Sequence, residues 1–295
     1  MINIQENIDL QTLNTFGLPG RARYFAELND AAELPALCNS EIFAKHPVLW
    51  LGGGSNILLR GDYPGLVVKI NNKGIREIRR SDGLVLLEAQ AGEIWHDFVC
   101  HTVAIGLNGL ENLSLIPGTV GAAPVQNIGA YGAEVSQVIQ EVHTVNRRSS
   151  EVRHFSNQEC NYGYRHSIFK EPEWADYIVT HVVLRLSKKP TLHLDYADLR
   201  ERVTAHTAEP TASDVRREVI HIRQEKLPDP KTLGNAGSFF MNPIISSEAF
   251  AELLKAHPNA PHYLLEDGRV KVPAGWLIDR CGLKGYRLGH AGVYE

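Results

Sequence analysis

A strand that runs into a turn with almost no side chains is the first segment that could do chemistry. The strand is the apolar run Pro47–Leu51, and the turn after it consists of Gly52, Gly53, Gly54, Ser55 and Asn56. Backbone N–H groups in a turn of this kind can approach a pyrophosphate, and the last two side chains add hydrogen-bond donors. The motif is neither a Rossmann fingerprint nor a P-loop, because Ile57 stands at the third glycine position and no G-K-S or G-K-T follows. Taken alone, it could also be an ordinary tight turn.

A second glycine-rich segment, Ile116–Gly132, keeps small or apolar side chains and has hardly any charge. It closes a long stretch, Gly106–Gly132, with too many glycines and prolines for a regular element, and loops of that length inside a domain are usually functional. A flat, uncharged heterocycle could lie against such backbone. The two segments together fit a cofactor that has both a diphosphate and a large ring.

Apolar runs bounded by turn residues predict the elements that must position these segments. We expect strands at Pro47–Leu51, Leu66–Ile70, Val85–Ala91 and Tyr177–Leu186. Apolar residues at spacings of three and four predict a helix over Ile94–Ile105.

The polar stretch Ser187–Pro190 reads as a domain joint, and the chain changes character after it. We expect a helix capped by Ser213 that runs to about Gln224, and another that starts at Ser246 or Ser247. A strand at Arg269–Val272 and a short helix from Ala274, ended by Gly282, complete a smaller α+β unit.

The composition of the 295-residue chain, 43% hydrophobic and 22% charged, predicts a globular protein with two or three compact units. The net charge is −4 and the basic residues are scattered, which argues against a nucleic-acid or anionic-membrane surface. The N-terminus does not resemble a signal peptide and no apolar stretch could span a bilayer, so we expect a cytoplasmic protein and, by default, a monomer.

The cysteines lie far apart and form no C-x-x-C pair, so we expect buried, reduced thiols and no metal site. They are Cys38, Cys100, Cys160 and Cys281.

The two glycine-rich segments resemble the vanillyl-alcohol-oxidase (PCMH) type of FAD domain. Four further motifs, in order along nearly the whole chain, resemble the UDP-N-acetylenolpyruvoylglucosamine reductase family: Leu13–Gly17, Gly163–Lys170, Lys226–Lys231 and Gly234–Phe240. The segment Leu194–Leu199 is similar to the tyrosine-bearing loop that covers substrate in the longer type of this family. The resemblance implies non-covalent FAD, held by Gly52, Gly53, Gly54, Ser55, Asn56, Ile116, Pro117, Gly118, Gly121, Ala122, Val125, Gln126, Asn127, Gly129, Ala130 and Tyr131.

The resemblance also implies a reaction in two halves, in which NADPH reduces FAD and a hydride then reaches the methylene carbon of an enolpyruvyl UDP-sugar. It gives Arg165 the role of stabilising the charge that develops on the substrate and Ser238 the role of proton donor. The structural alternatives are a surface salt bridge for Arg165 and a position in a turn for Ser238. The implied substrate contacts, each of which could instead be packing or surface, are Tyr164, Tyr196, Arg223, Lys226, Asn242 and Tyr263.

The predicted fold is therefore α+β, with an FAD-binding domain at residues 1–189 in two subdomains that meet near residue 72. A substrate-binding domain follows at residues 190–295. The family carries a further C-terminal segment with a glutamate that assists the arginine, and this chain stops at Glu295 before it, so we expect an incomplete second domain. The alternatives are a flavin- or UDP-sugar-binding protein with impaired turnover, and a flavin oxidase of the same superfamily.

Overall fold

The computed structural model describes residues 2–189, 191–196 and 198–295. It divides into two compact units, Met1–Ala236 and Gly237–Glu295. The predicted joint at Ser187–Pro190 and the predicted substrate loop Leu194–Leu199 each include one residue, Pro190 and Ala197, that lies outside the described residues.

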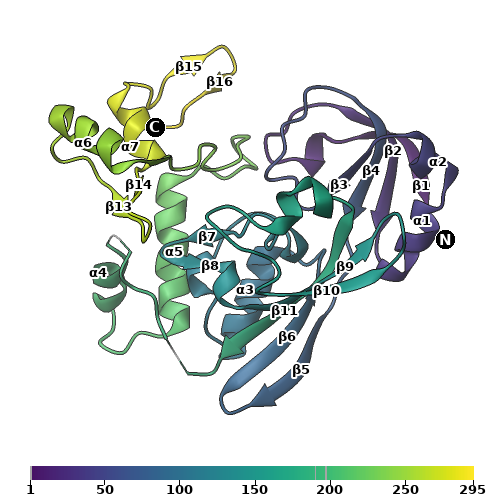
Figure 1. Cartoon of the computed structure of the whole chain (residues 1–295), viewed down its shortest axis with the longest axis horizontal. Helices are drawn as coiled ribbons and strands as arrows, with labels where there is room; N and C mark the ends of the chain where they lie inside the picture. Colours follow the sequence, from purple (N-terminus) through teal and green to yellow (C-terminus); the bar gives the residue numbers. More distant parts are fainter. Residues whose placement is uncertain (1, 190, 197) are drawn as a thin grey trace. The chain divides into compact units, whose positions relative to one another are not determined.

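The first unit begins with a four-stranded mixed sheet in the order β1-β2-β4-β3 (Figure 1). β2 and β4 pair in parallel, as do β3 and β4, whereas β1 is antiparallel to β2. The strands are β1 (Ile4–Asp9), β2 (Arg21–Leu28), β3 (Val48–Leu51) and β4 (Tyr63–Ile70). The short helices α1 (Leu34–Cys38) and α2 (Glu41–Lys45) connect β2 to β3, and α1 buries Leu34 and Leu37 in the main core.

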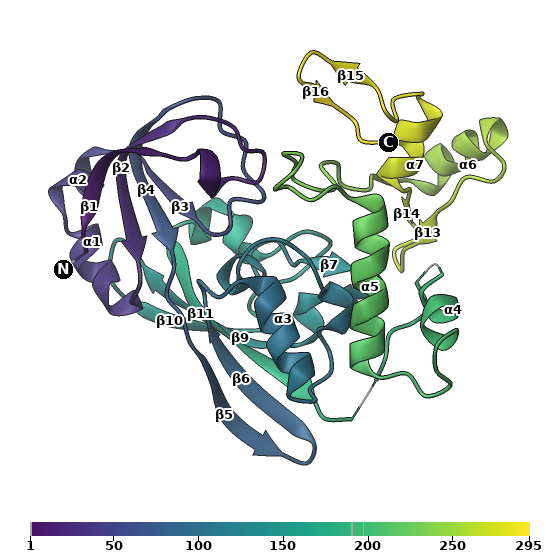
Figure 2. The same ribbon diagram turned by 180° about the vertical axis from the view of Figure 1, so that it is seen from behind.

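A five-stranded antiparallel sheet in the order β10-β9-β11-β6-β5 forms the rest of the framework. The first sheet ends at Ile70 and the second begins at Ile75, close to the subdomain boundary expected near residue 72. The β5–β6 hairpin projects from the sheet in both views (Figures 1 and 2). The strands are β5 (Ile75–Ser81), β6 (Leu84–Gln90), β9 (Ile139–Asn146), β10 (Val152–Ser156) and β11 (Tyr177–Ser187).

The helix predicted over Ile94–Ile105 is α3 (Trp95–Ala104), with the two predicted end residues as its caps. The segment between α3 and β9 contains only short elements, as its breakers predict. These are the 3-10 turns η3 (Glu111–Leu113), η4 (Val120–Ala122) and η5 (Val135–Gln137) and the ribbon β7 (Gly129–Ala130) with β8 (Ala133–Glu134). The other 3-10 turns are η1 (Gln11–Leu13), η2 (Ala31–Glu33), η6 (Ile168–Lys170) and η7 (Pro172–Trp174).

Two helices after β11 still belong to the first unit. α5 (Ala212–Lys226) buries Val215, Val219 and Ile222 against α4 (Leu199–Thr204) and contacts η3 and α3. Each of these buried apolar side chains contributes roughly 1.5–3 kcal/mol. The compact units separate at residues 236 and 237. The boundary expected at 189 and 190 divides the chain by function, into FAD-binding and substrate-binding parts, and stays a prediction.

The N-cap predicted for α5 at Ser213 is wrong. Thr211 caps this helix in a reciprocal capping box, in which its hydroxyl oxygen accepts from the Asp214 N–H at 3.4 Å and Asp214 Oδ2 accepts from the Thr211 N–H at 3.0 Å. Asp214 lies three residues after Thr211, the spacing that a capping box needs.

The second unit contains α6 (Ser247–Ala256), α7 (Ala274–Arg280) and small antiparallel sheets. Ser246 caps α6, as expected for one of the two candidate serines. The predicted strand is confirmed as β14 (Val270–Lys271), which is shorter than expected and lies between β12 (Ile244–Ile245) and β13 (Tyr263–Leu264). β15 (Arg287–Leu288) and β16 (Ala291–Gly292) form a hairpin.

All four cysteines are free, but only Cys160 is buried, and Cys281 is exposed, so the expectation of four buried thiols is wrong. Among the described helices, none combines the length and the apolar composition that crossing a membrane requires.

A cavity between two glycine-rich segments

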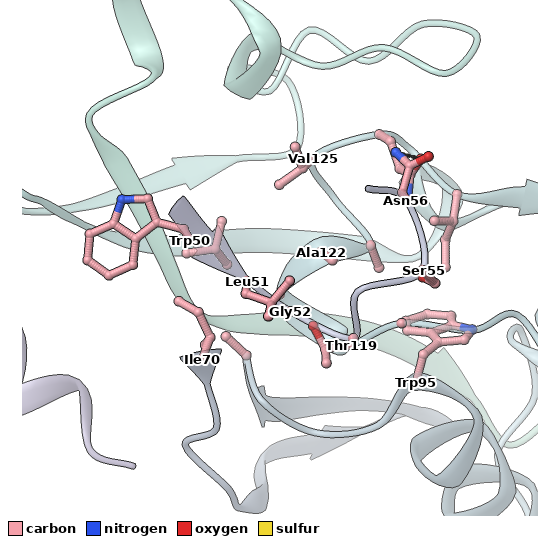
Figure 3. A pocket seen from close by; sticks show the side chains of 18 of the residues that line it. Trp50, Leu51, Gly52, Ser55, Asn56, Ile70, Trp95, Thr119, Ala122 and Val125 are labelled. Carbon is pink, nitrogen blue, oxygen red and sulfur yellow. Dashed lines mark hydrogen bonds between the residues drawn. The ribbon is translucent and has the colours of Figure 1, made fainter. Parts of the chain in front are cut away.

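Both glycine-rich segments line one cavity of about 380 Å³ in the first unit. Figure 3 shows the Trp50 indole at one end and the Ser55, Asn56 and Trp95 side chains at the other. Eleven of the predicted cofactor residues line it: Gly52, Gly53, Gly54, Ser55, Asn56, Pro117, Gly118, Gly121, Ala122, Val125 and Gln126.

The glycines are required because other parts of the chain approach this turn closely. A Cβ atom on Gly53 would lie 2.7 Å from Gly118 Cα, and one on Gly52 would lie 2.8 Å from Thr119 Oγ1. Gly54 has φ +65°, and a Cβ there would lie 1.9 Å from the carbonyl oxygen of Leu13. Any larger residue would therefore push the cavity wall apart or distort its turn.

Free backbone donors make the turn after β3 a candidate anion site. Among the described residues, the N–H groups of Gly53, Gly54, Ser55 and Asn56 have no hydrogen-bond acceptor. Converging, unpaired N–H groups form the concave nests that bind phosphate oxygens. This turn therefore fits the diphosphate of a dinucleotide.

The opposite wall fits a flat ring system. Apolar side chains from strand ends and from the second glycine-rich segment provide most of its surface: Ile70, Ala91, Ala122, Ala123, Val125, Ile128, Ile178 and Val179. The Trp50 indole N–H is buried without a partner among the described residues, so it is available to a ligand. Lys170 adds a positive charge at the cavity, where burial lowers the pKa of its ammonium group.

Several of these lining residues were not predicted. Four of them lie in predicted strands: Trp50, Ile70, Ala91 and Val179. The apolar pattern of such a strand indicates core packing just as well as a ligand wall. Lys170 ends the motif Gly163–Lys170, and this position is the one feature of the sequence that indicates a role for Lys170 at the site.

The other five predicted cofactor residues do not line the cavity: Ile116, Asn127, Gly129, Ala130 and Tyr131. Asn127 is fully buried and cross-links the loop, since its amide nitrogen donates to Glu134 Oε2 at 2.8 Å and to the Gly163 carbonyl at 3.0 Å. Its amide oxygen accepts from the Ser136 N–H at 3.1 Å. Asn127 thus supports the loop from behind.

Arg165 lies against the same loop. Its guanidinium donates to the Gly129 carbonyl at 2.6 Å and to the Asn127 carbonyl at 3.4 Å, and its charge lies 5.5 Å from the Tyr164 ring centroid. The backbone of Arg165 has φ +55°, a conformation that costs a non-glycine residue of order 1 kcal/mol or more. A strained, half-buried arginine held by two carbonyls is positioned by its surroundings, as a functional cation would be.

Tyr131 groups with predicted substrate residues. Its ring meets the Tyr196 ring edge-on with 5.6 Å between centroids, and the Arg223 guanidinium lies beside its hydroxyl. Burial lowers the pKa of Arg223, and its Nε has no partner among the described residues. Lys226 ends the same helix, α5. Tyr131, Tyr196 and Arg223 form a polar aromatic cluster that could hold a negatively charged nucleotide sugar.

The remaining predicted residues belong to the second unit. Ser238 is exposed in a segment without regular structure. The Asn242 amide oxygen accepts from the Ala274 N–H at 2.9 Å at the start of α7, and the Lys271 ammonium lies 5.2 Å from the Tyr263 ring centroid.

His96 supports the second glycine-rich segment. The Leu115 N–H donates to His96 Nδ1 at 3.0 Å, so this nitrogen must be unprotonated, and Leu115 holds the strained φ of +57° just before the cavity wall. Burial, followed by the charge of Arg216, lowers the pKa of His96 below its ordinary value of 6.5.

We expect the free energy of unfolding to decrease as the pH falls below 6.5, by about the worth of one hydrogen bond, 0.5–1.5 kcal/mol. Since the folded state takes up the His96 proton at a lower pH than the unfolded chain does, this stabilisation is complete above pH 6.5 and is lost as the pH falls through the lowered pKa of His96. Urea unfolding at a series of pH values below 7.5 would measure the loss. His96→Gln, which keeps an acceptor but does not titrate, should flatten the profile, and an unchanged profile in that variant would assign the effect to another group.

Comparison with known proteins matches the same regions. The model of an FAD binding domain family matches residues 22–156, and that of the UDP-N-acetylenolpyruvoylglucosamine reductase C-terminal domain matches residues 229–295. Relatives of that reductase name are found in Chromobacterium violaceum (52% identity, all of this chain and 87% of the relative) and Neisseria gonorrhoeae (54%, 99% and 85%). A crystal structure of the enzyme of that name from Thermus caldophilus aligns with a TM-score of 0.66 at 24% identity, over all of this chain and 85% of that one.

These matches confirm the predicted fold class. The chain is α+β and carries the vanillyl-alcohol-oxidase (PCMH-type) FAD-binding fold, with two sheets whose glycine-rich connections enclose the cavity. The FAD cofactor predicted from the two segments agrees with the matched domain.

Proposed function

This chain belongs to the UDP-N-acetylenolpyruvoylglucosamine reductase family, and we propose that it reduces UDP-N-acetylglucosamine enolpyruvate to UDP-N-acetylmuramate with NADPH, in peptidoglycan precursor synthesis. The observation that carries the proposal is the cavity, which is lined by the Gly53–Asn56 turn, whose N–H groups have no acceptor among the described residues, and by an apolar wall. The chemistry that a bound FAD supplies is the transfer of a hydride from NADPH to the methylene carbon of the enolpyruvyl group.

We assign Arg165 to stabilising the negative charge that develops on the substrate during its reduction. Hydride arrival at the methylene carbon pushes electrons toward the neighbouring carboxylate, and a guanidinium placed there acts where charge develops. Arg165 has a fixed planar fork and cannot lose its proton, both of which suit this role. The two carbonyls that hold it, at Asn127 and Gly129, fix its orientation before substrate binds.

Ser238 is the residue we assign to protonating the neighbouring carbon. A serine hydroxyl is a weak acid, so it can donate only when the acceptor is carbanion-like and the transfer is strongly downhill. Its exposed position in the second unit leaves the hydroxyl available to a ligand. Substrate binding falls in this proposal to Tyr164, Tyr196, Arg223, Lys226, Asn242 and Tyr263.

The proposal includes a cytoplasmic monomer. Both substrates are highly charged nucleotides, which do not cross a hydrocarbon layer. Light scattering after size exclusion would test the monomer.

An anaerobic titration tests the activity. We expect NADPH to bleach the oxidised flavin band and the enolpyruvyl UDP-sugar to restore it. Bleaching without recovery would indicate a flavoprotein that binds without turnover. Rapid reoxidation by oxygen together with indifference to the UDP-sugar would indicate an oxidase of the same superfamily.

A further inference from the structure

Three histidines that are not among the cavity-lining residues lie in a row across the five-stranded sheet. His143 on β9 faces His154 on β10 in the strand register, and it faces His181 on β11 on its other side. The ring centroids of His143 and His154 are 3.7 Å apart, and those of His143 and His181 are 4.2 Å apart. Residues directly opposite one another in antiparallel strands lie on the same face, so the imidazoles share one face of the sheet.

Glu141 adds a carboxylate to this row. It precedes His143 by two residues on β9 and therefore points to the same face. Its Oε2 lies 2.9 Å from His143 Nε2, and the ligand atoms of Glu141, His143 and His154 all lie within 4.8 Å of one another. The His143 side chain is 12% exposed and that of Glu141 is 42% exposed, whereas His154 is exposed. The three donors thus form a group that is half-buried at its base and open to solvent.

We propose that Glu141, His143 and His154 bind a divalent transition-metal ion, with zinc as the best fit. Two imidazoles and one carboxylate are a common three-residue zinc set, and a water completes the tetrahedron on the open side. Calcium and magnesium require oxygen ligands, so two imidazoles select against both. Neighbouring donor atoms of a tetrahedral zinc site lie about 3.3 Å apart, given zinc–nitrogen bonds of about 2.0 Å. Side-chain rotations that move the ligand atoms by about 1 to 1.5 Å would therefore bring them to the spacing that zinc needs.

The neighbouring charges leave these three ligands available. Glu88 is already bound by Arg76, whose guanidinium donates to both carboxylate oxygens at 3.1 and 3.0 Å. His181 Nδ1 contacts the Thr180 hydroxyl at 3.2 Å, and its Nε2 lies 3.7 Å from Glu88. His181 therefore packs beside the ligand set and supports the His143 ring. An ion here would cross-link β10, which is an edge strand, to β9.

Zinc titration of the full chain, freed of metal by chelation, tests the site. In competition with a chromophoric chelator we expect one zinc ion per chain, and a Tm that rises by about 5 °C at about a hundredfold excess over Kd. His154→Ala and Glu141→Gln should each weaken zinc binding about tenfold or more. His206→Ala removes an exposed histidine outside the cluster and should leave zinc binding unchanged.

Cobalt substitution identifies the ligands. We expect the visible bands of tetrahedral Co²⁺ without the near-ultraviolet charge-transfer band of a thiolate. Unchanged zinc affinity in both His154→Ala and Glu141→Gln, with native circular dichroism, would overturn the proposal, and so would thiolate ligation. The flavin content should be the same in these variants, so the outcome is independent of the proposed reductase activity.

Discussion

Replacing Arg165 by lysine is expected to slow reoxidation of the reduced flavin by the UDP-sugar about 10²–10³-fold while leaving its reduction by NADPH unchanged. Lysine keeps the charge but loses the planar fork that now reaches the carbonyls of Gly129 and Asn127. The charge would then no longer be fixed where the substrate becomes negative. Anaerobic stopped-flow measurement of the two half-reactions gives both rates on the same protein.

A purely structural role of Arg165 predicts a different result. If Arg165 only holds the loop together, Arg165→Lys should lower the flavin content and slow both half-reactions alike. Ser238→Ala is the matched variant in the other compact unit, and it removes a proton donor without touching the loop. We expect it to block substrate-driven reoxidation with normal NADPH reduction, whereas equal loss in both halves would make Ser238 structural.

The cavity could be anticipated from the sequence because each of its glycine-rich segments can be recognised by itself. Gly53 and Gly54 are needed where other backbone approaches closely, and Gly52 where the Thr119 side chain does, so no side chain fits at these positions. The second segment was recognised for the same reason, since its small residues allow the approach from the other side. Helix α3 followed from apolar spacing that matches its buried face.

Elements with little burial could not be anticipated. β1 and β5 expose most of their residues, and β5 has the charged sequence Ile-Arg-Glu-Ile-Arg-Arg-Ser, so neither carries an alternating apolar signal. Their pairing partners in the sheets decide their conformation. The extent of the first compact unit could not be anticipated for a similar reason, because the contact of α5 with η3 joins segments that are far apart in sequence.

Long-range contacts also decide the roles of individual site residues. Asn127 and Tyr131 lie in a predicted cofactor segment, yet Asn127 binds Gly163 and Tyr131 packs against Tyr196. From the sequence alone, residues that are neighbours in one loop are expected to bind the same ligand. The fold separates them, since the loop bends at both residues, whose φ angles are +44° and +49°.

Substituting Gly54 by alanine is expected to abolish FAD retention and to cost more than about 3 kcal/mol of unfolding free energy. The new Cβ would lie 1.9 Å from the Leu13 carbonyl oxygen, and that oxygen belongs to backbone that cannot rotate away. The positive φ of +65° adds a penalty of about 1 kcal/mol. Flavin-to-protein absorbance ratios and urea unfolding measure the two effects.

Gly106→Ala separates strain from collision. Gly106 has φ +76°, and a Cβ there would meet nothing within 4 Å, so this variant carries the conformational penalty alone. We expect it to lose about 1 kcal/mol and to keep its flavin. Gly53→Ala, whose Cβ would lie 2.7 Å from Gly118 Cα without a positive φ, should fold and still lose FAD because it pushes the two segments apart. Full flavin content in Gly53→Ala would show that the close approach of these segments does not form the cofactor site.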